Sequence, residues 1–315
     1  MELRQEISKL KMPARDAKLT LLFIALLLFP GSAIPRGRTA AVVLTGELTQ
    51  SIPPRTSQGL TGSQFARLVS QMNPQQREQA IKEEILKGNV PEFLRKLVPV
   101  DLSCELQGGK TLTATIFVAP DYLAIGSNND FLRIPMNLHT ALAIADQFGF
   151  ILPTKKMVDA IYRQSRYHLA PQPLMAGPQM RSTEYYLKHN QMIDAQAQAL
   201  GVKLGALVSG DKKDIVITNL LLKNVGKIAI YGWHRGPDAP IQPLSTVHGA
   251  NYADYSHGLR LVSDKVLING DLRSVFEILQ NPSTARVLSD EGPIRSIEEL
   301  LSQTSTLAIV SAPSN

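Results

Sequence analysis

Val98-Pro-Val-Asp-Leu-Ser-Cys-Glu-Leu106, Gly108-Gly109 and Thr111-Leu-Thr-Ala-Thr-Ile-Phe-Val118 form one nearly continuous segment in the first half of the chain. Apolar residues take alternating positions in the first run, which is the period of a β-strand. A pair of glycines between two strand-like runs is a hairpin signal. We therefore expect two antiparallel strands here, at the centre of the fold.

Helical and strand-like patterns are grouped on either side of this hairpin. Residues 61–97 and 137–200 contain helical spacings, whereas 204–231 and 259–268 contain further strand-like runs. Elements that are grouped instead of alternating favour an α+β fold over a doubly wound parallel sheet. We expect a helical N-terminal segment and a central mixed or antiparallel sheet with flanking helices.

The N-terminus has the pattern of an export signal. Basic side chains are frequent in 1–18, an apolar run extends from Leu19 to Phe29, and small residues follow at Gly31 and Ala33. This order predicts a secretory signal that is cleaved near Ala33. Eleven apolar residues are too few to span ~30 Å of hydrocarbon. We expect a secreted or periplasmic protein with no stable membrane anchor after cleavage.

The rest of the chain divides by composition. We expect a signal peptide at 1–33, a flexible linker at 34–60, a helical segment at 61–97, an α+β main domain at 98–304 and a tail at 305–315. Residues 1–33 carry five basic and three acidic side chains, so their removal lowers the net charge from +6 to +4. This balance is compatible with an anionic polymer outside the cytoplasm. No motif indicates nucleic-acid binding.

Side chains suited to chemistry gather between residues 231 and 260. This segment holds three of the six histidines, three of the eight tyrosines and the only tryptophan. We expect a long loop from Trp233 to Ser256. Ordered loops of this length are usually functional, so we expect a site in this loop. Two interpretations of the charged turn Gly210-Asp-Lys-Lys-Asp214 are open: it places Lys213 or Asp214 at the mouth of a cleft, or it is a solvated hairpin, which is the favoured interpretation.

Three mechanisms can use these residues. In the first, His234, His248, Asp254 and His257 supply ligands to a divalent metal such as zinc, which activates a water for hydrolysis.

In the second mechanism, no metal takes part. A histidine accepts a proton, Tyr252 or Tyr255 donates one, and Arg260 or Gln242 stabilises an anionic intermediate. This set suits β-elimination from an acidic polysaccharide.

The third mechanism is nucleophilic, through Ser256 or Ser245, and no Gly-x-Ser-x-Gly motif supports it. A structural interpretation is also open: Asp254 caps a turn, Gly258 supplies a positive φ, and His257 is a hydrogen-bonded core residue.

The runs Ile228–His234, Ile241–Leu244 and Tyr252–Val262 resemble segments of predicted secreted bacterial proteins of unassigned function. Leu152-Pro-Thr with Val158-Asp159 supports the same resemblance. The resemblance implies a secreted domain with the 231–260 segment at its centre, and no particular reaction.

The leading hypothesis is a secreted hydrolase that acts on a cell-envelope or extracellular polymer, or a smaller substrate, with help from a metal. The alternatives are a polysaccharide lyase and a glycan-binding protein in which Trp233, Tyr252 and Tyr255 stack on sugar rings. The candidate catalytic residues are His248, Asp254, His257, Tyr255 and Arg260. The candidate substrate-binding residues are Trp233, Tyr231, Gln242 and Tyr252.

Overall fold

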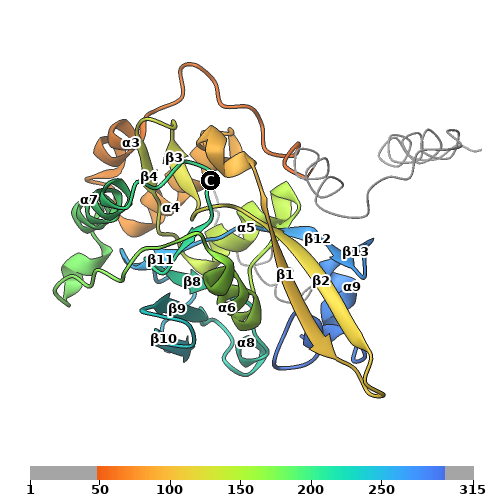
Figure 1. Ribbon diagram of the computed structural model, residues 1–315. Helices are drawn as coiled ribbons and strands as arrows, with labels where there is room; N and C mark the ends of the chain where they lie inside the picture. Colours follow the sequence, from red (N-terminus) through yellow and green to blue (C-terminus); the bar gives the residue numbers. More distant parts are fainter. Residues whose placement is uncertain (1–47, 295–315) are drawn as a thin grey trace, which may run out of the picture. The chain divides into compact units, whose positions relative to one another are not determined.

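A computed structural model of the protein describes residues 48–294 (Figure 1). The predicted signal peptide at 1–33, most of the linker at 34–60 and the tail at 305–315 lie outside these residues. None of the described helices combines the length and the apolar character that crossing a membrane requires. Helices and grouped strands confirm the predicted α+β fold class.

The helical segment at 61–97 is confirmed. Helix α3 (Gly62–Val69) begins after Thr61, and α4 (Pro74–Leu86) begins after Asn73. Each of these cap residues forms a reciprocal capping box with a glutamine three positions later, which satisfies backbone donors at the start of the helix. A 3-10 turn, η2 (Glu92–Arg95), completes the segment. The apolar side chains that these helices bury include Phe65, Val69, Ile81 and Ile85.

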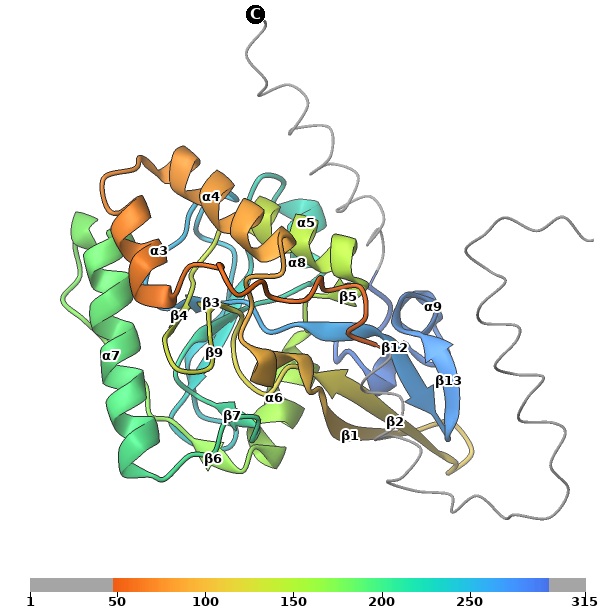
Figure 2. The same ribbon diagram turned by 90° about the horizontal axis from the view of Figure 1, so that it is seen from above.

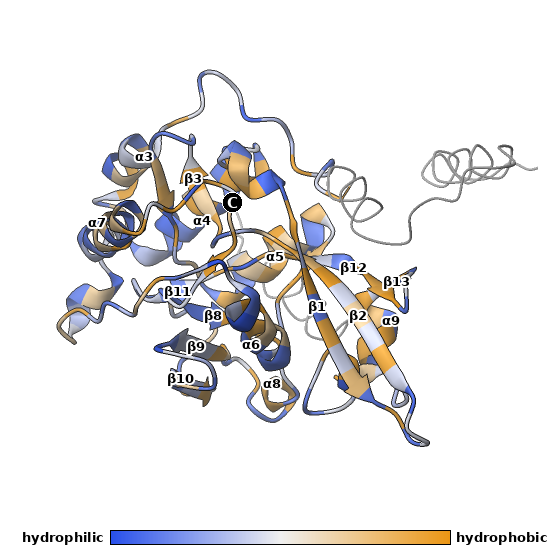
Figure 3. Cartoon of the chain, in the orientation of Figure 1, coloured by the Kyte–Doolittle hydropathy of each residue, from blue (hydrophilic) through white to orange (hydrophobic). Residues whose placement is uncertain are grey.

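The predicted hairpin forms one side of an antiparallel five-stranded sheet. Strands β1 (Val98–Glu105) and β2 (Thr111–Val118) pair without a register shift over their whole length. Strand β2 then pairs with β12 (Val262–Ile268), which pairs with β13 (Asp271–Ser274) and with the short β5 (Phe150–Ile151). Hydrophobic and hydrophilic residues alternate along the hairpin in Figure 3, as expected for strands with one face buried.

A second sheet contains the segment that sequence analysis selected. Its order is β10 (Pro240–Ser245), β9 (Ile230–His234), β8 (Lys213–Ile215) and β11 (His257–Gly258). Strand β8 is antiparallel to β9 and parallel to β11. The expected loop from 233 to 256 is therefore wrong in part, because β10 lies within it. Pro240 and Pro243 argue against a strand in the sequence, but β10 is an edge strand, where prolines are tolerated.

The predicted helices of the middle region are present. They are α5 (Leu138–Phe148), α6 (Lys155–Gln164) and α7 (Thr183–Ala199), with side-chain caps at Asn137, Thr154 and Ser182. Not all of the strand-like region 204–231 is strand, because β8 ends at Ile215 and α8 (Leu220–Lys223) follows it.

Shorter elements complete the fold. They are β3 (Ala124–Gly126), β4 (Phe131–Arg133), β6 (Tyr167–His168), η3 (Pro178–Arg181), β7 (Val208–Ser209), α9 (Val275–Gln280) and η4 (Ala285–Val287). Figures 1 and 2 place α3, α7 and the second sheet on one side, and the hairpin with β12, β13 and α9 on the other.

Gly258 joins the second sheet to the core by a close approach. A Cβ atom at this position would lie 2.5 Å from the ring of Tyr122 and 2.9 Å from the Cβ of Lys212. The hypothesis that Gly258 supplies a positive φ is wrong, because it is absent from the glycines that have one. Its small size, not its backbone freedom, is what the site requires.

Gly258→Ala should lower the free energy of unfolding by about 1–3 kcal/mol, because the added methyl group overpacks the contact with Tyr122. The measurement is the midpoint of urea unfolding. Gly236→Ala is the matched control, since a Cβ there meets nothing within 4 Å. Equal midpoints for the two variants would contradict this account of Gly258.

Candidate functional site

The carboxylate of Asp254 is the centre of a polar cluster before β11. The side chain of Asp254 is 1% exposed, and its Oδ1 accepts hydrogen bonds from the backbone N–H (2.8 Å) and the hydroxyl (2.6 Å) of Ser256. Its Oδ2 accepts a hydrogen bond from the hydroxyl of Tyr252 at 3.0 Å. The backbone N–H of His257 donates to the carbonyl oxygen of Asp254. The hypothesis that Asp254 caps a turn is thus confirmed.

Asp254 is ionised at neutral pH. Burial raises the pKa of this carboxyl group, but the charge that His257 carries when protonated, the hydrogen bonds from Ser256 and the charge of Lys213 outweigh burial, so the net pKa is lowered. A carboxylate that accepts three hydrogen bonds from its own segment is a fixed negative charge under the surface.

His257 is completely buried beside Asp254. Its Nε2 lies 4.0 Å from Oδ2 of Asp254, and neither ring nitrogen has a hydrogen-bond partner among residues 48–294. Burial lowers the pKa of His257 to about 4, and the charge of Lys213 acts in the same direction. The interpretation of His257 as a hydrogen-bonded residue is wrong. It is a neutral imidazole at neutral pH, and it has no surface to offer a substrate.

His248 and Tyr252 are the half-buried members of the cluster. Their rings stack with centroids 4.0 Å apart and planes 10° apart. Burial, followed by the charge of Asp254, raises the pKa of Tyr252 to about 12, and burial lowers the pKa of His248. At neutral pH the site therefore presents a neutral imidazole and a protonated phenol side by side, above a buried carboxylate.

Two predicted catalytic residues instead hold the framework. The guanidinium of Arg260 is 1% exposed and donates to the backbone carbonyls of Ala119 (2.9 Å) and Val208 (2.8 Å). Tyr255 is 2% exposed, and its hydroxyl accepts a hydrogen bond from the backbone N–H of Leu174 at 2.7 Å. Neither side chain can contact a substrate at the surface.

Two predicted substrate-binding residues lie apart from the stacked pair. Trp233 is 6% exposed, has a φ of 56°, and donates from its indole nitrogen to the carbonyl oxygen of Asp211 at 3.0 Å. Gln242 lies on the edge strand β10, and its amide donates to the carbonyl oxygen of Pro243. The indole ring belongs to the core and is not a platform for a sugar.

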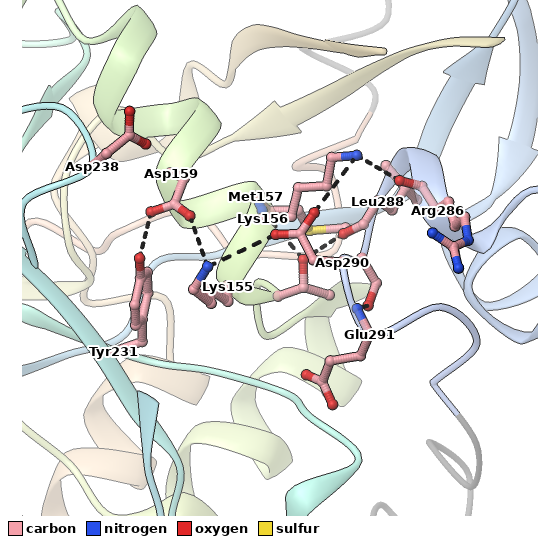
Figure 4. A network of polar contacts seen from close by, with 12 residues as sticks. Lys155, Lys156, Met157, Asp159, Tyr231, Asp238, Arg286, Leu288, Asp290 and Glu291 are labelled. Carbon is pink, nitrogen blue, oxygen red and sulfur yellow. Dashed lines mark hydrogen bonds and ion pairs between the residues drawn. The ribbon is translucent and has the colours of Figure 1, made fainter. Parts of the chain in front are cut away.

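Tyr231 and His234 belong to a separate network around Asp159 on α6. Oδ1 of Asp159 accepts a hydrogen bond from the hydroxyl of Tyr231 at 2.8 Å and lies 3.1 Å from Nε2 of His234. Lys155 lies 3.5 Å from the other carboxylate oxygen and 3.8 Å from Asp290. Figure 4 shows the chain of contacts from Tyr231 through Asp159 and Lys155 to Asp290. This network ties β9 to α6 and to the segment after η4.

The predicted metal site is wrong for the described part of the chain. No group of three or more His, Cys, Asp or Glu side chains between residues 48 and 294 is arranged to hold a metal ion. His234 faces Asp159, whereas His248, Asp254 and His257 form the other cluster. The physical reason is that β9 continues through His234 and carries its side chain to α6.

The charged turn at 210–214 is also different from the prediction. Asp211, Lys212 and Asp214 are 0%, 0% and 3% exposed, so this turn is not a solvated hairpin. The ammonium of Lys212 donates to the carbonyl oxygen of Tyr255 at 2.6 Å, and Asp214 accepts a hydrogen bond from Tyr122 at 2.9 Å. Burial lowers the pKa of Lys212 to about 7 and raises that of Asp214 to about 6.

Two cations that are not among the predicted site residues lie at the edge of the cluster. The guanidinium carbon of Arg181 lies 5.3 Å from the ring centroid of Tyr252. The ammonium of Lys213 lies 4.9 Å from the ring centroid of Trp233 and acts electrostatically on His248 and Asp254. The charged turn was a signal for Lys213. Nothing in the sequence around Arg181 connects it to Tyr252, which lies far along the chain.

No protein-family model, curated protein or solved structure matches the chain. The resemblance to secreted bacterial proteins stays a prediction. A function must therefore be inferred from the side chains of the cluster themselves.

The buried imidazole of His257 gives a pH-dependent stability. The folded state resists a proton that the unfolded chain accepts near pH 6.5, because burial lowers the pKa of His257 to about 4. The folded pKa is depressed, so this contribution is complete above pH 6.5 and is lost as the pH falls towards 4. His257→Gln has no such titration. The stability of the wild type relative to this variant should fall by up to about 1.4 kcal/mol per pH unit in that window.

Urea unfolding of both proteins at several pH values measures this difference. Parallel stability curves between pH 6.5 and 4 would show that the imidazole is protonated in the folded state.

Proposed function

We propose that this protein is a metal-independent lyase that cleaves a polymer of the cell envelope or extracellular space, with His248 as the base and Tyr252 as the acid. The predicted export signal suits such a substrate. Of the two enzymatic hypotheses from the sequence, the site geometry supports elimination better than hydrolysis.

The observation that carries this proposal is the stacking of His248 on Tyr252 above Asp254. Two side chains that can exchange protons are half-buried, and their centroids are 4.0 Å apart. The hydroxyl of Tyr252 is held by Asp254 at 3.0 Å. Among residues 48–294, the hydrogen bond from Tyr252 to Asp254 is the one that joins the pair to a buried polar side chain. The imidazole of His248 is therefore able to contact a substrate.

The protonation states suit the reaction at neutral pH. Burial lowers the pKa of His248, so the imidazole is neutral and can accept a proton. The raised pKa of Tyr252, about 12, keeps the phenol protonated, and its hydroxyl must turn from Asp254 to the substrate before it can act as the acid. In an elimination, His248 takes the proton from a carbon atom, the C–H electrons form a C=C bond, and the neighbouring C–O bond breaks. Tyr252 gives its proton to the leaving oxygen.

Hydrolysis is served less well by the same residues. Glycoside hydrolysis generally requires two carboxyl groups that flank the scissile bond. Asp254 is the carboxylate of this cluster, and it is 1% exposed with both oxygens engaged. Ser256 is fully buried, and its hydroxyl donates to Asp254, so a nucleophilic serine is not supported.

A purely glycan-binding role has less support. Trp233 and Tyr255, two of the three rings proposed for stacking on sugars, are 6% and 2% exposed. A sugar platform requires accessible ring faces. His248 covers the ring of Tyr252, the third of these residues.

Tyr252→Phe and His248→Gln should each lower kcat by about 10²- to 10⁴-fold, because each removes one of the two proton transfers. The phenylalanine keeps the ring beside Arg181 and His248. The measurement is the appearance of unsaturated, ultraviolet-absorbing chain ends in a panel of acidic and neutral polysaccharides.

The controls are Tyr167→Phe and His139→Gln, which alter residues outside the cluster. For the wild type, we expect the acidic limb of kcat/KM to lie below pH 6.5, because the pKa of His248 is lowered. Chain cleavage that yields reducing ends without unsaturation would show that the site performs hydrolysis instead.

Dialysis of the wild-type protein against a metal chelator should leave its activity unchanged, since proton transfer by His248 and Tyr252 needs no Lewis acid. The comparison is turnover before and after dialysis and after addition of zinc. Loss of turnover that zinc restores would refute metal independence.

A further inference from the structure

Arg181 and Lys213 are half-buried cations without a carboxylate partner. Neither side chain has an acidic oxygen within 4.0 Å among residues 48–294, and the charge of Arg181 acts on the buried Glu78 only over a longer distance. Their contacts are instead with aromatic rings, those of Tyr252 and Trp233. Partly desolvated cations of this kind are well suited to an anion from outside the chain.

Arg181 is positioned by both the core and the site. It ends η3, immediately before the Ser182 cap of α7, and its carbonyl oxygen accepts a hydrogen bond from Arg77 at 2.7 Å. The preceding carbonyl, of Met180, accepts one from the backbone N–H of Tyr255. The Nε of Arg181 is buried and has no hydrogen-bond partner in the described chain. The backbone of Arg181 is thus held by hydrogen bonds, whereas N–H donors of its guanidinium have no partner in the described chain.

Lys213 approaches the same cluster from the second sheet. Its Cα is paired with that of Gly232 on β9 and that of His257 on β11, and its backbone N–H donates to the carbonyl oxygen of Ser256 at 2.7 Å. The ammonium acts electrostatically on Asp254, His257 and His248. A residue of the central strand β8 therefore brings a positive charge to the acid–base pair.

The charges around the stacked pair are mostly positive. Arg181, Lys213 and Lys227 act on Tyr252 or His248, and Asp254 is the acidic group that opposes them. Both oxygens of Asp254 already accept hydrogen bonds from the protein. Among the nearby charges, that of Asp254 has the largest effect on each ring. Since its oxygens are occupied by hydrogen bonds within the protein, Arg181 and Lys213 are the charged groups left to bind a negatively charged group of the substrate.

We infer that Arg181 and Lys213 bind a carboxylate of the substrate beside the bond that His248 and Tyr252 cleave, and that the substrate is a polysaccharide of uronic acid residues. This inference rests on the proposed lyase activity. Arg181 and Lys213 take the role that sequence analysis gave to Arg260 and Gln242.

The chemistry of elimination explains why a carboxylate is needed. The proton that His248 removes must lie on a carbon next to an electron-withdrawing group, and a uronate supplies one at the carbon that bears its carboxylate. Neutralisation of that carboxylate by Arg181 and Lys213 stabilises the negative charge that develops on it. The C–H electrons then form the C=C bond, the C–O bond breaks, and the leaving oxygen takes the proton of Tyr252. The step needs no oxidant or reductant.

Binding tests this inference separately from turnover. Calorimetry with the Tyr252→Phe variant and a short oligouronate should show binding, and the added change Arg181→Gln or Lys213→Met should weaken it by about 10- to 100-fold each. Arg181→Lys, which keeps the charge, should lose less than Arg181→Gln. The matched controls are Arg166→Gln and Lys188→Met, since both residues are exposed and outside the cluster.

The same oligosaccharide with its carboxyl groups reduced to alcohols should bind the Tyr252→Phe protein weakly. Its affinity should be no higher than that of the acidic ligand for the variants that lack Arg181 or Lys213. Equal affinity for the acidic and reduced ligands, or affinities unaffected by Arg181→Gln and Lys213→Met, would overturn the inference. Selective binding of the acid that depends on both cations, without turnover by the wild type, would support this anion site and refute only the lyase proposal.

Discussion

The site depends on the hydrogen bonds that the buried carboxylate of Asp254 accepts. Buried charges are costly unless they are paired and hydrogen-bonded, and hydrogen bonds to charged groups contribute about 1.5–3 kcal/mol each. Asp254 accepts three of them, two from Ser256 and one from Tyr252. The bonds from Ser256 hold the turn that leads into β11, and the bond from Tyr252 holds the phenol beside His248. One buried charge thus holds both the local backbone and the phenol, and it adds to the burial that keeps Tyr252 protonated.

Two further buried charged residues, Lys212 and Asp214, lie next to the segment that carries Asp254. Lys212 on the turn before β8 donates to the carbonyl oxygen of Tyr255, and Asp214 on β8 accepts a hydrogen bond from Tyr122. The Tyr122 ring also faces Gly258, where a side chain would not fit. Buried charges of this kind add little net stability, because the loss of their hydration offsets their attraction. They place β11 and β8, and with them Asp254 and Lys213, at fixed positions.

Local signals in the sequence predicted the fold class and most of the helices. Cap residues such as Asn137 and Ser182 mark helix starts through their own side chains, so no distant contact is needed to identify them. The site was predicted only as a region. The direction of His234 depends on the positive φ of Trp233, and the burial of Arg260 depends on backbone carbonyls far away in the chain. Arg181 reaches Tyr252 from η3, which no spacing in the sequence could indicate. Tertiary packing decides which of several histidines and arginines meet, and composition alone does not contain that information.

The central claim is that a substrate meets the protein at the stacked pair of His248 and Tyr252. A crystal structure of the Tyr252→Phe variant with a bound oligouronate tests it most directly. We predict that a carboxylate of the ligand lies within about 3 Å of donors on Arg181 and Lys213, with the adjacent carbon facing a ring nitrogen of His248. A ligand bound elsewhere on the described domain, with His248 free of contact, would contradict this account.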